Sequence, residues 1–145
     1  MKIVIDTNTL INASGDDYNY GNRIIDEILN DKIQVFANRE TLKENRLLIN
    51  KKITDQQFLY KLEQYFYKVE QVDSEYINVV EDREDNKILA SAVKSGSEYL
   101  ITSDWHLLKL KEYEGVKILS PQGFWAEYES ETGKGWHDWL NNFIK

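Results

Sequence analysis

The stretch Met1-Lys-Ile-Val-Ile-Asp-Thr-Asn8 decides the fold that we expect for this chain. Its apolar run, Ile3 to Ile5, is β-branched throughout, which is typical of a strand buried on both faces of a parallel sheet. The run ends at Asp6, and polar residues at this end of a strand lie where open α/β sheets bind their ligands. We therefore hypothesise that Asp6 belongs to a metal site. The alternative is that Asp6, Thr7 and Asn8 only cap the next helix, because all three residue types are favourable N-caps.

The composition indicates one folded domain. The chain has 145 residues, of which 41% are hydrophobic, and it has no cysteine, which excludes disulfides and thiolate metal sites. No apolar run is long enough to span a bilayer and no signal-peptide pattern is present, so we expect a cytoplasmic protein without a membrane partner. The net charge of −7 argues against strong nonspecific binding to phosphate. It does not argue against a metal-dependent nuclease, because a bound cation reverses the local field.

Strands and helices are expected to alternate along the chain. Helices are predicted around residues 9–13, 24–29, 39–51, 55–69, 85–94 and 104–113, and from Pro121 onward. This alternation predicts an α/β domain, with a central parallel sheet of about five strands flanked by helices on both faces. The strands are predicted at residues 3–5, 33–37, 69–72, 99–102 and 116–119.

Apolar residues at helical spacing predict which helix faces are buried. The helix over 39–51 is expected to contact the core through Leu42, Leu47, Leu48 and Ile49. The next helix is expected to pack an aromatic stripe into the core rather than to bind a ligand with it. That stripe consists of Phe58, Leu62, Tyr65, Phe66 and Val69.

Three acids recur in equivalent positions. Asp6 and Asp104 each follow a buried strand, and Asp85 shares a helix face with Ile88 and Leu89, three and four residues later. Each acid alone is explained by N-capping and by the helix dipole. Brought together at one sheet edge, however, like charges repel and resist ionisation, and a bound cation is the usual remedy.

A fourth acid is expected from the helix that begins near Arg39. Glu44 precedes Leu47 and Leu48 by three and four residues, so we expect its face to continue into an apolar patch and prefer it to Glu40. A site made only of carboxylates suits Mg²⁺ or Mn²⁺, which commonly serve phosphoryl transfer. Phosphodiester hydrolysis is therefore the leading chemistry.

The order and spacing of these motifs resemble those of a PIN domain. The resemblance runs from Met1 to about Phe124. Within the PIN family, the sequence is similar to the VapC-type toxins of bacterial toxin–antitoxin pairs. Two departures are Arg83, where the family often has proline, and Asn45, where an apolar residue is usual. The matching segments are Ile3-Val-Ile-Asp-Thr-Asn8, Glu44, Asp82-Arg-Glu-Asp-Asn-Lys-Ile-Leu-Ala90 and Leu100-Ile-Thr-Ser-Asp104.

This resemblance implies a three-layer PIN-like domain that acts as a metal-dependent endoribonuclease on single-stranded RNA. It also implies an antitoxin partner and a homodimer. Asn8 and Thr102 match residues that support the site. The catalytic and metal-binding residues that it implies are Asp6, Glu44, Asp85 and Asp104, with Mg²⁺ or Mn²⁺.

Two other functions remain open from the sequence. One is a DNA-directed nuclease of the flap-endonuclease type, and the other is a catalytically silent PIN-like binding module. His106 is expected to be partly exposed on its helix, whereas Arg46, Lys51 and Lys52 are candidates for phosphate contacts. We expect the nuclease domain to span residues 1–129. Residues 130–145 are expected to form a Trp-rich extension that packs either on the same domain or on a partner.

Overall fold

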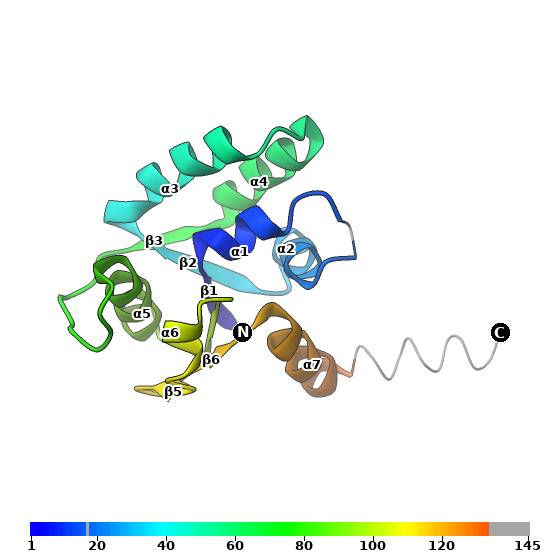
Figure 1. The fold of residues 1–145 in the computed structure, drawn as a ribbon. Helices are drawn as coiled ribbons and strands as arrows, with labels where there is room; N and C mark the ends of the chain where they lie inside the picture. The colour runs from blue at the N-terminus through cyan, green and yellow to red at the C-terminus, as the bar shows by residue number, and fades with distance from the viewer. Residues whose placement is uncertain (17, 134–145) are drawn as a thin grey trace.

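The structure, a computed structural model, describes residues 1–16 and 18–133. Within them, helices and strands alternate over most of the chain (Figure 1). The strands are β1 (Lys2–Ile5), β2 (Gln34–Asn38), β3 (Glu70–Val72), β4 (Tyr99–Ile101), β5 (Glu112–Tyr113) and β6 (Val116–Leu119). The helices are α1 (Thr7–Asn12), α2 (Tyr20–Leu29), α3 (Arg39–Lys52), α4 (Gln56–Lys68), α5 (Arg83–Ser95), α6 (Trp105–Leu108) and α7 (Pro121–Thr132).

The strands form one sheet in the order β3-β2-β1-β4-β6-β5. All neighbouring pairs are parallel except β5 and β6, which are antiparallel. The predicted α/β fold with a central parallel sheet is therefore confirmed. The sixth strand, β5, is a two-residue addition that the sequence did not indicate.

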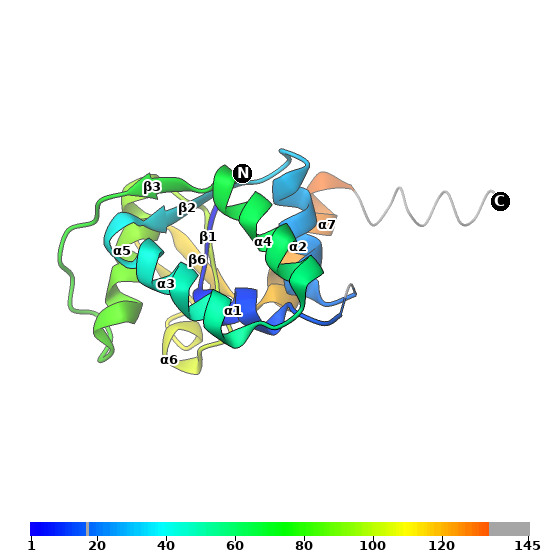
Figure 2. The same ribbon diagram turned by 90° about the horizontal axis from the view of Figure 1, so that it is seen from above.

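Helices cover both faces of this sheet, which gives three layers (Figures 1 and 2). The strand residues alternate between the faces, because successive side chains on a strand point in opposite directions. Ile3 and Ile5 of β1 pack in the core beneath α1, α2, α3, α4 and α7. Val4 faces the other way, into a smaller core closed by Leu89 of α5 and Leu107 of α6.

Each described helix begins at an aspartate, asparagine or serine. These N-cap side chains accept hydrogen bonds from the backbone N–H groups of the first helical turn, which otherwise have no partner. Asp6 and Asp104 therefore do cap helices, as the simpler interpretation predicted. The caps of α1 to α7 are Asp6, Asn19, Asn38, Asp55, Asp82, Asp104 and Ser120.

Three local predictions were wrong. The helix expected over 104–113 is only α6. Lys111, with a φ angle of 63°, leads into β5, and Glu114, with a φ angle of 50°, lies in the turn from β5 to β6. The helix expected to start at Asp85 begins two residues earlier, with Asp82 as its cap. Leu47 and Leu48 are 61% and 38% exposed, so they do not contact the core as expected.

Other local predictions were confirmed. Phe58, Leu62 and Tyr65 of the aromatic stripe are buried in the core. Pro121 occupies the first turn of α7, and this helix runs to Thr132. The expectations for residues 134–145, including the tryptophans of the extension, lie outside the described residues. None of the helices described is long and apolar enough to cross a membrane.

Candidate metal centre

The topology of the sheet creates a switch point next to β1. Strand β1 pairs with β2 on one side and with β4 on the other, so the connections that follow β1 and β4 lead to opposite halves of the sheet. In open parallel sheets, ligands bind outside the carboxyl ends of the strands at such a switch point. Asp6 directly follows β1, and Asp104 lies three residues beyond the end of β4. The fold therefore brings these two acids to one edge.

Asp6 is held in place by hydrogen bonds to both carboxylate oxygens. The hydroxyl of Thr102 donates to Oδ2 over 2.6 Å, and the backbone N–H groups of Asn8 and Thr9 donate to Oδ1 over 2.6 and 3.3 Å. Asp6 is 5% exposed and Thr102 is fully buried. The Thr102 hydroxyl oxygen also accepts the N–H of Asp104 at 3.0 Å. One threonine thus fixes the positions of both acids.

Asp85 reaches the same edge from α5. This helix covers the face of the sheet that holds the smaller core, opposite to the face covered by α1. Its backbone N–H donates to the Asp82 cap at 3.1 Å. The next residue, Asn86, anchors the preceding loop: its Oδ1 accepts the N–H groups of Val79 and Val80 at 2.9 and 3.0 Å. Its Nδ2 donates to the carbonyl oxygens of Val80 and Asp82 at 2.8 and 3.1 Å. These bonds fix the start of α5, and hence the position of Asp85.

The four aspartates at this edge interact electrostatically. The pKa of Asp85 is raised from 3.8 to about 7, chiefly because the carboxyl is buried. The charge of Asp104 and a hydrogen bond between the Asp85 and Asp104 carboxyls raise this pKa further. The charges of Asp82 and Asp6 act in the same direction. A hydrogen bond between two carboxyl groups requires a proton on one of them. The structure thus brings Asp6, Asp85 and Asp104 together, and it adds Asp82 to the group.

The donor chemistry of this cluster fits a hard divalent cation. All the side-chain donors are carboxylate oxygens, which Mg²⁺ and Mn²⁺ prefer. Within residues 1–16 and 18–133, however, no group of three or more acidic or histidine side chains is placed so that it could hold a metal ion. Asp6, Asp85 and Asp104 would therefore have to come closer together than in this conformation to bind one cation.

Glu44 does not share the setting of the other predicted ligands. It is exposed on α3, and it is not among the charges that raise the pKa of Asp85. The apolar patch that favoured Glu44 over Glu40 does not exist, because Leu47 and Leu48 face solvent. Glu40 is also exposed, and its carboxylate lies 3.7 Å from the ammonium group of Lys87. Asn8 is exposed and contributes its backbone N–H to Asp6.

Comparison with known proteins gives the family. The sequence model of the PIN domain matches residues 2–106. This chain belongs to the PIN domain family. No curated protein sequence matches it. A solved structure of similar fold is described as VapBC2 from Rickettsia felis bound to a DNA fragment from their promoter. It is 15% identical, has a TM-score of 0.54, and the match covers 81% of this chain and 97% of that chain.

Two functional candidates in this PIN domain were missed from the sequence. Trp105 follows Asp104 directly and is 70% exposed. Asn86 is 7% exposed and makes the four loop contacts described above. The signal that could have found Trp105 is the tryptophan itself, which stands directly after the last acid in the sequence. Asn86 gave no comparable signal, because its role depends on the path of the loop before α5.

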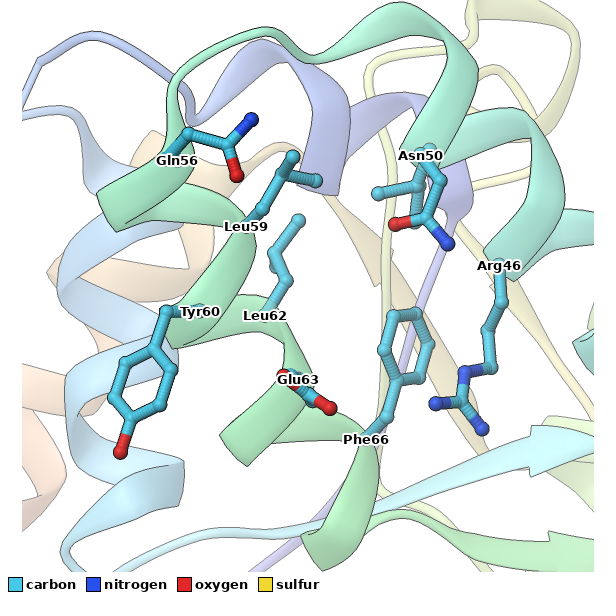
Figure 3. Close-up of a pocket in the computed structure, with 9 residues that line it drawn as sticks. Arg46, Asn50, Gln56, Leu59, Tyr60, Leu62, Glu63 and Phe66 are labelled. Carbon is cyan, nitrogen blue, oxygen red and sulfur yellow. The ribbon is translucent and has the colours of Figure 1, made fainter.

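A separate hollow of about 470 Å³ lies between α3 and α4 of the PIN domain (Figure 3). The guanidinium of Arg46, one of the candidate phosphate contacts, lies 5.0 Å from the ring centre of Phe66 there. Leu59 and Leu62 contribute apolar side chains, and Asn50 contributes an amide. None of the four clustered aspartates lines this hollow, so it is distinct from the candidate metal centre.

Proposed function

We propose that this PIN domain is a metal-dependent endoribonuclease that cleaves single-stranded RNA by phosphodiester hydrolysis. The observation that supports this most is the meeting of Asp6, Asp85 and Asp104 at the switch point of the sheet. A carboxyl group with a pKa raised by burial and by neighbouring acids is typical of a functional carboxylate cluster.

Asp6, Asp85 and Asp104 are the proposed ligands for Mg²⁺ or Mn²⁺. A bound cation of this kind lowers the pKa of its water and stabilises the departing oxygen of the phosphodiester. Thr102 keeps Asp6 oriented through its hydroxyl, and the N–H groups of Asn8 and Thr9 hold the other carboxylate oxygen of Asp6. The pKa of Asp85 is raised to about 7 and its carboxyl is hydrogen-bonded to Asp104, so a bound cation would displace the proton that Asp85 holds.

Glu44 is proposed as the fourth acid, either as a metal ligand or as the group that positions the attacking water. The support for Glu44 is its place in the motif order of the family, on the helix that follows β2. Its exposure allows the long side chain to turn toward the cation without breaking an existing buried contact.

We also propose that the protein is the cytoplasmic toxin of a toxin–antitoxin pair and forms a homodimer. The similar fold described as VapBC2 supports the toxin–antitoxin part of this proposal. An antitoxin would occupy the acidic cluster or its rim, and a basic side chain placed among the four aspartates would replace the cation. Such a contact would silence the enzyme without unfolding it.

The test is cleavage of matched single-stranded RNA and DNA oligonucleotides in Mg²⁺ or Mn²⁺. Asp6→Asn should lose most of the activity while keeping the fold, because asparagine retains the capping oxygen. Asp55→Asn is a matched control: Asp55 also caps a helix, through the N–H groups of Gln57 and Phe58 at 3.0 and 3.3 Å, but it lies outside the cluster. Full activity of Asp6→Asn would overturn the proposal, and preference for DNA would favour the flap-endonuclease type.

A further inference from the structure

Trp105 is a large aromatic side chain that is left in solvent beside the candidate metal centre. It is 70% exposed, although tryptophan is on average one of the most buried residue types. Consecutive Cα atoms are only about 3.8 Å apart, so the Trp105 side chain starts directly next to Asp104. Any molecule that brings a phosphodiester to the acids therefore passes close to this indole ring.

The fold does not need the Trp105 ring for its stability. Helix α6 is attached to the core by Leu107, which is fully buried against the smaller core together with Leu89 and Leu100. Asp104 caps this helix by accepting the N–H of His106 at 2.8 Å. The indole contributes little burial, so the residue is available for an intermolecular contact.

A cation accompanies Trp105 on the same turn of chain. The N–H of Lys109 donates to the carbonyl oxygen of Trp105 at 2.9 Å, which places the two residues one helical turn apart. Residues at this spacing are neighbours on a helix surface. Lys109 and His106 are both exposed. An aromatic face flanked by a cation is the combination with which proteins hold the bases and phosphates of a single strand.

We propose that Trp105 is a stacking platform for a base next to the scissile phosphate, with Lys109 contacting the neighbouring phosphate. This inference rests on the proposed nuclease function and extends it to the recognition of the substrate. A base stacked on Trp105 would hold the strand next to the acidic cluster, which otherwise repels phosphate. Stacking of this kind is tolerant of sequence, because every base has an aromatic face.

The alternative occupant of Trp105 is another protein chain. The nucleic acid is favoured because the exposed ring adjoins Asp104 and has a cation beside it. Other exposed aromatic residues, such as Tyr67 on α4, do not adjoin any of the four aspartates in the chain. Tyr67 is 79% exposed and therefore provides a matched control for the loss of an exposed ring.

The test measures binding of a single-stranded oligouridine by fluorescence anisotropy in EDTA and low salt, so that cleavage does not interfere. Trp105→Ala should weaken binding by about tenfold or more, the effect expected for losing one stacked base. Trp105→Phe should recover part of the affinity, and Tyr67→Ala should have no effect. An abasic strand of the same length should bind wild type and Trp105→Ala equally.

Cleavage assays provide the second measurement. Trp105→Ala should raise KM by a similar factor and leave kcat nearly unchanged, because the ring holds the strand and does not take part in the chemistry. Unchanged affinity and KM in Trp105→Ala would overturn the inference while leaving the nuclease function intact, as would failure of the wild type to bind oligouridine. A change confined to self-association in sedimentation would overturn it in favour of a protein contact.

The two proposals can fail separately. Binding that depends on Trp105 without cleavage in any metal would support the stacking platform and contradict the enzymatic function. Cleavage that does not depend on Trp105 would support the enzymatic function and contradict the stacking platform.

Discussion

The Thr102 hydroxyl donates a 2.6 Å hydrogen bond to Oδ2 of Asp6, and it thereby joins two residues that are 96 positions apart in the chain. The same hydroxyl oxygen accepts the N–H of Asp104 at 3.0 Å. The ends of β1 and β4 are therefore linked by side chains as well as by their backbone ladder. This link gives the first prediction.

Thr102→Val should destabilise the protein and impair cleavage together. Valine keeps the shape of threonine but removes the hydroxyl, so a carboxylate oxygen of Asp6 and the N–H of Asp104 lose a buried partner. The cost of such losses is about 1–3 kcal/mol in the free energy of unfolding, measured by urea denaturation. Thr102→Ser, which keeps the hydroxyl, should stay close to wild type. Equal stability of the valine variant and the wild type would show that the link is unimportant.

Stability without metal should fall as the pH rises, because of Asp85. Its pKa is about 7 in the folded protein against 3.8 for an unperturbed group, so the folded state binds the proton more tightly. The resulting stabilisation is complete below about pH 4 and is lost as the pH rises through 7. After allowance for solvent screening, we expect a loss on the order of 1–2 kcal/mol.

Urea denaturation in EDTA at pH 5 and pH 8 measures this effect. Asp85→Asn should remove this part of the pH dependence and should be more stable than wild type at pH 8, since it removes a charge from a repelling cluster. Glu63→Gln, on the exposed side of α4, should behave like wild type. If Asp85→Asn and wild type lost stability in parallel between these pH values, the electrostatic account of Asp85 would be wrong.

Asn86→Ala should destabilise the loop before α5. Asn86 accepts from Val79 and Val80 and donates to Val80 and Asp82, so its loss leaves several buried backbone groups unpaired. We expect a loss of about 1–3 kcal/mol in thermal or chemical unfolding. Metal affinity should fall as well, because Asp85 depends on the position of this loop. Asn50→Ala, at an exposed position of α3, serves as the control and should change neither quantity.

Glu44 and Glu40 can be separated by paired substitutions on the same helix. Glu44→Gln should reduce cleavage by about 10- to 100-fold if the residue supports the cation or its water. Glu40→Gln should have little effect, because that carboxylate faces Lys87 at the surface. Steady-state cleavage of an RNA oligonucleotide measures both variants. If Glu40→Gln reduced cleavage and Glu44→Gln did not, Glu40 rather than Glu44 would be the fourth acid of the site.

The sequence was sufficient to predict the features that depend on local residue patterns. The β-branched run at Ile3 to Ile5 and the acids at the ends of β1 and β4 were placed correctly, because strand burial and its abrupt end are visible along the chain. The parallel sheet followed from the alternation of strands with helices. The meeting of Asp6 with Asp104 then followed from the topology.

Features that depend on tertiary contacts were not predictable in the same way. The helical spacing of Leu47 and Leu48 suggested burial, but no element of the described chain covers that side of α3 enough to bury them. The short β5 replaced the end of a predicted helix because Lys111 and Glu114 adopt left-handed backbone angles that their residue types do not signal. The exposure of Trp105 was also not visible, since an isolated tryptophan beside leucines is usually part of a core.

The most direct test of the account is a calorimetric titration of the metal-free protein with Mn²⁺ at about pH 6.5 in buffers of different ionisation enthalpy. We predict binding with release of close to one proton, because the cation displaces the proton held by Asp85 and Asp104. Binding should weaken strongly in Asp6→Asn, and the proton release should disappear in Asp85→Asn. Absence of Mn²⁺ binding to the wild type, or binding that is unchanged in Asp6→Asn, would contradict the central claim that these acids form a metal centre.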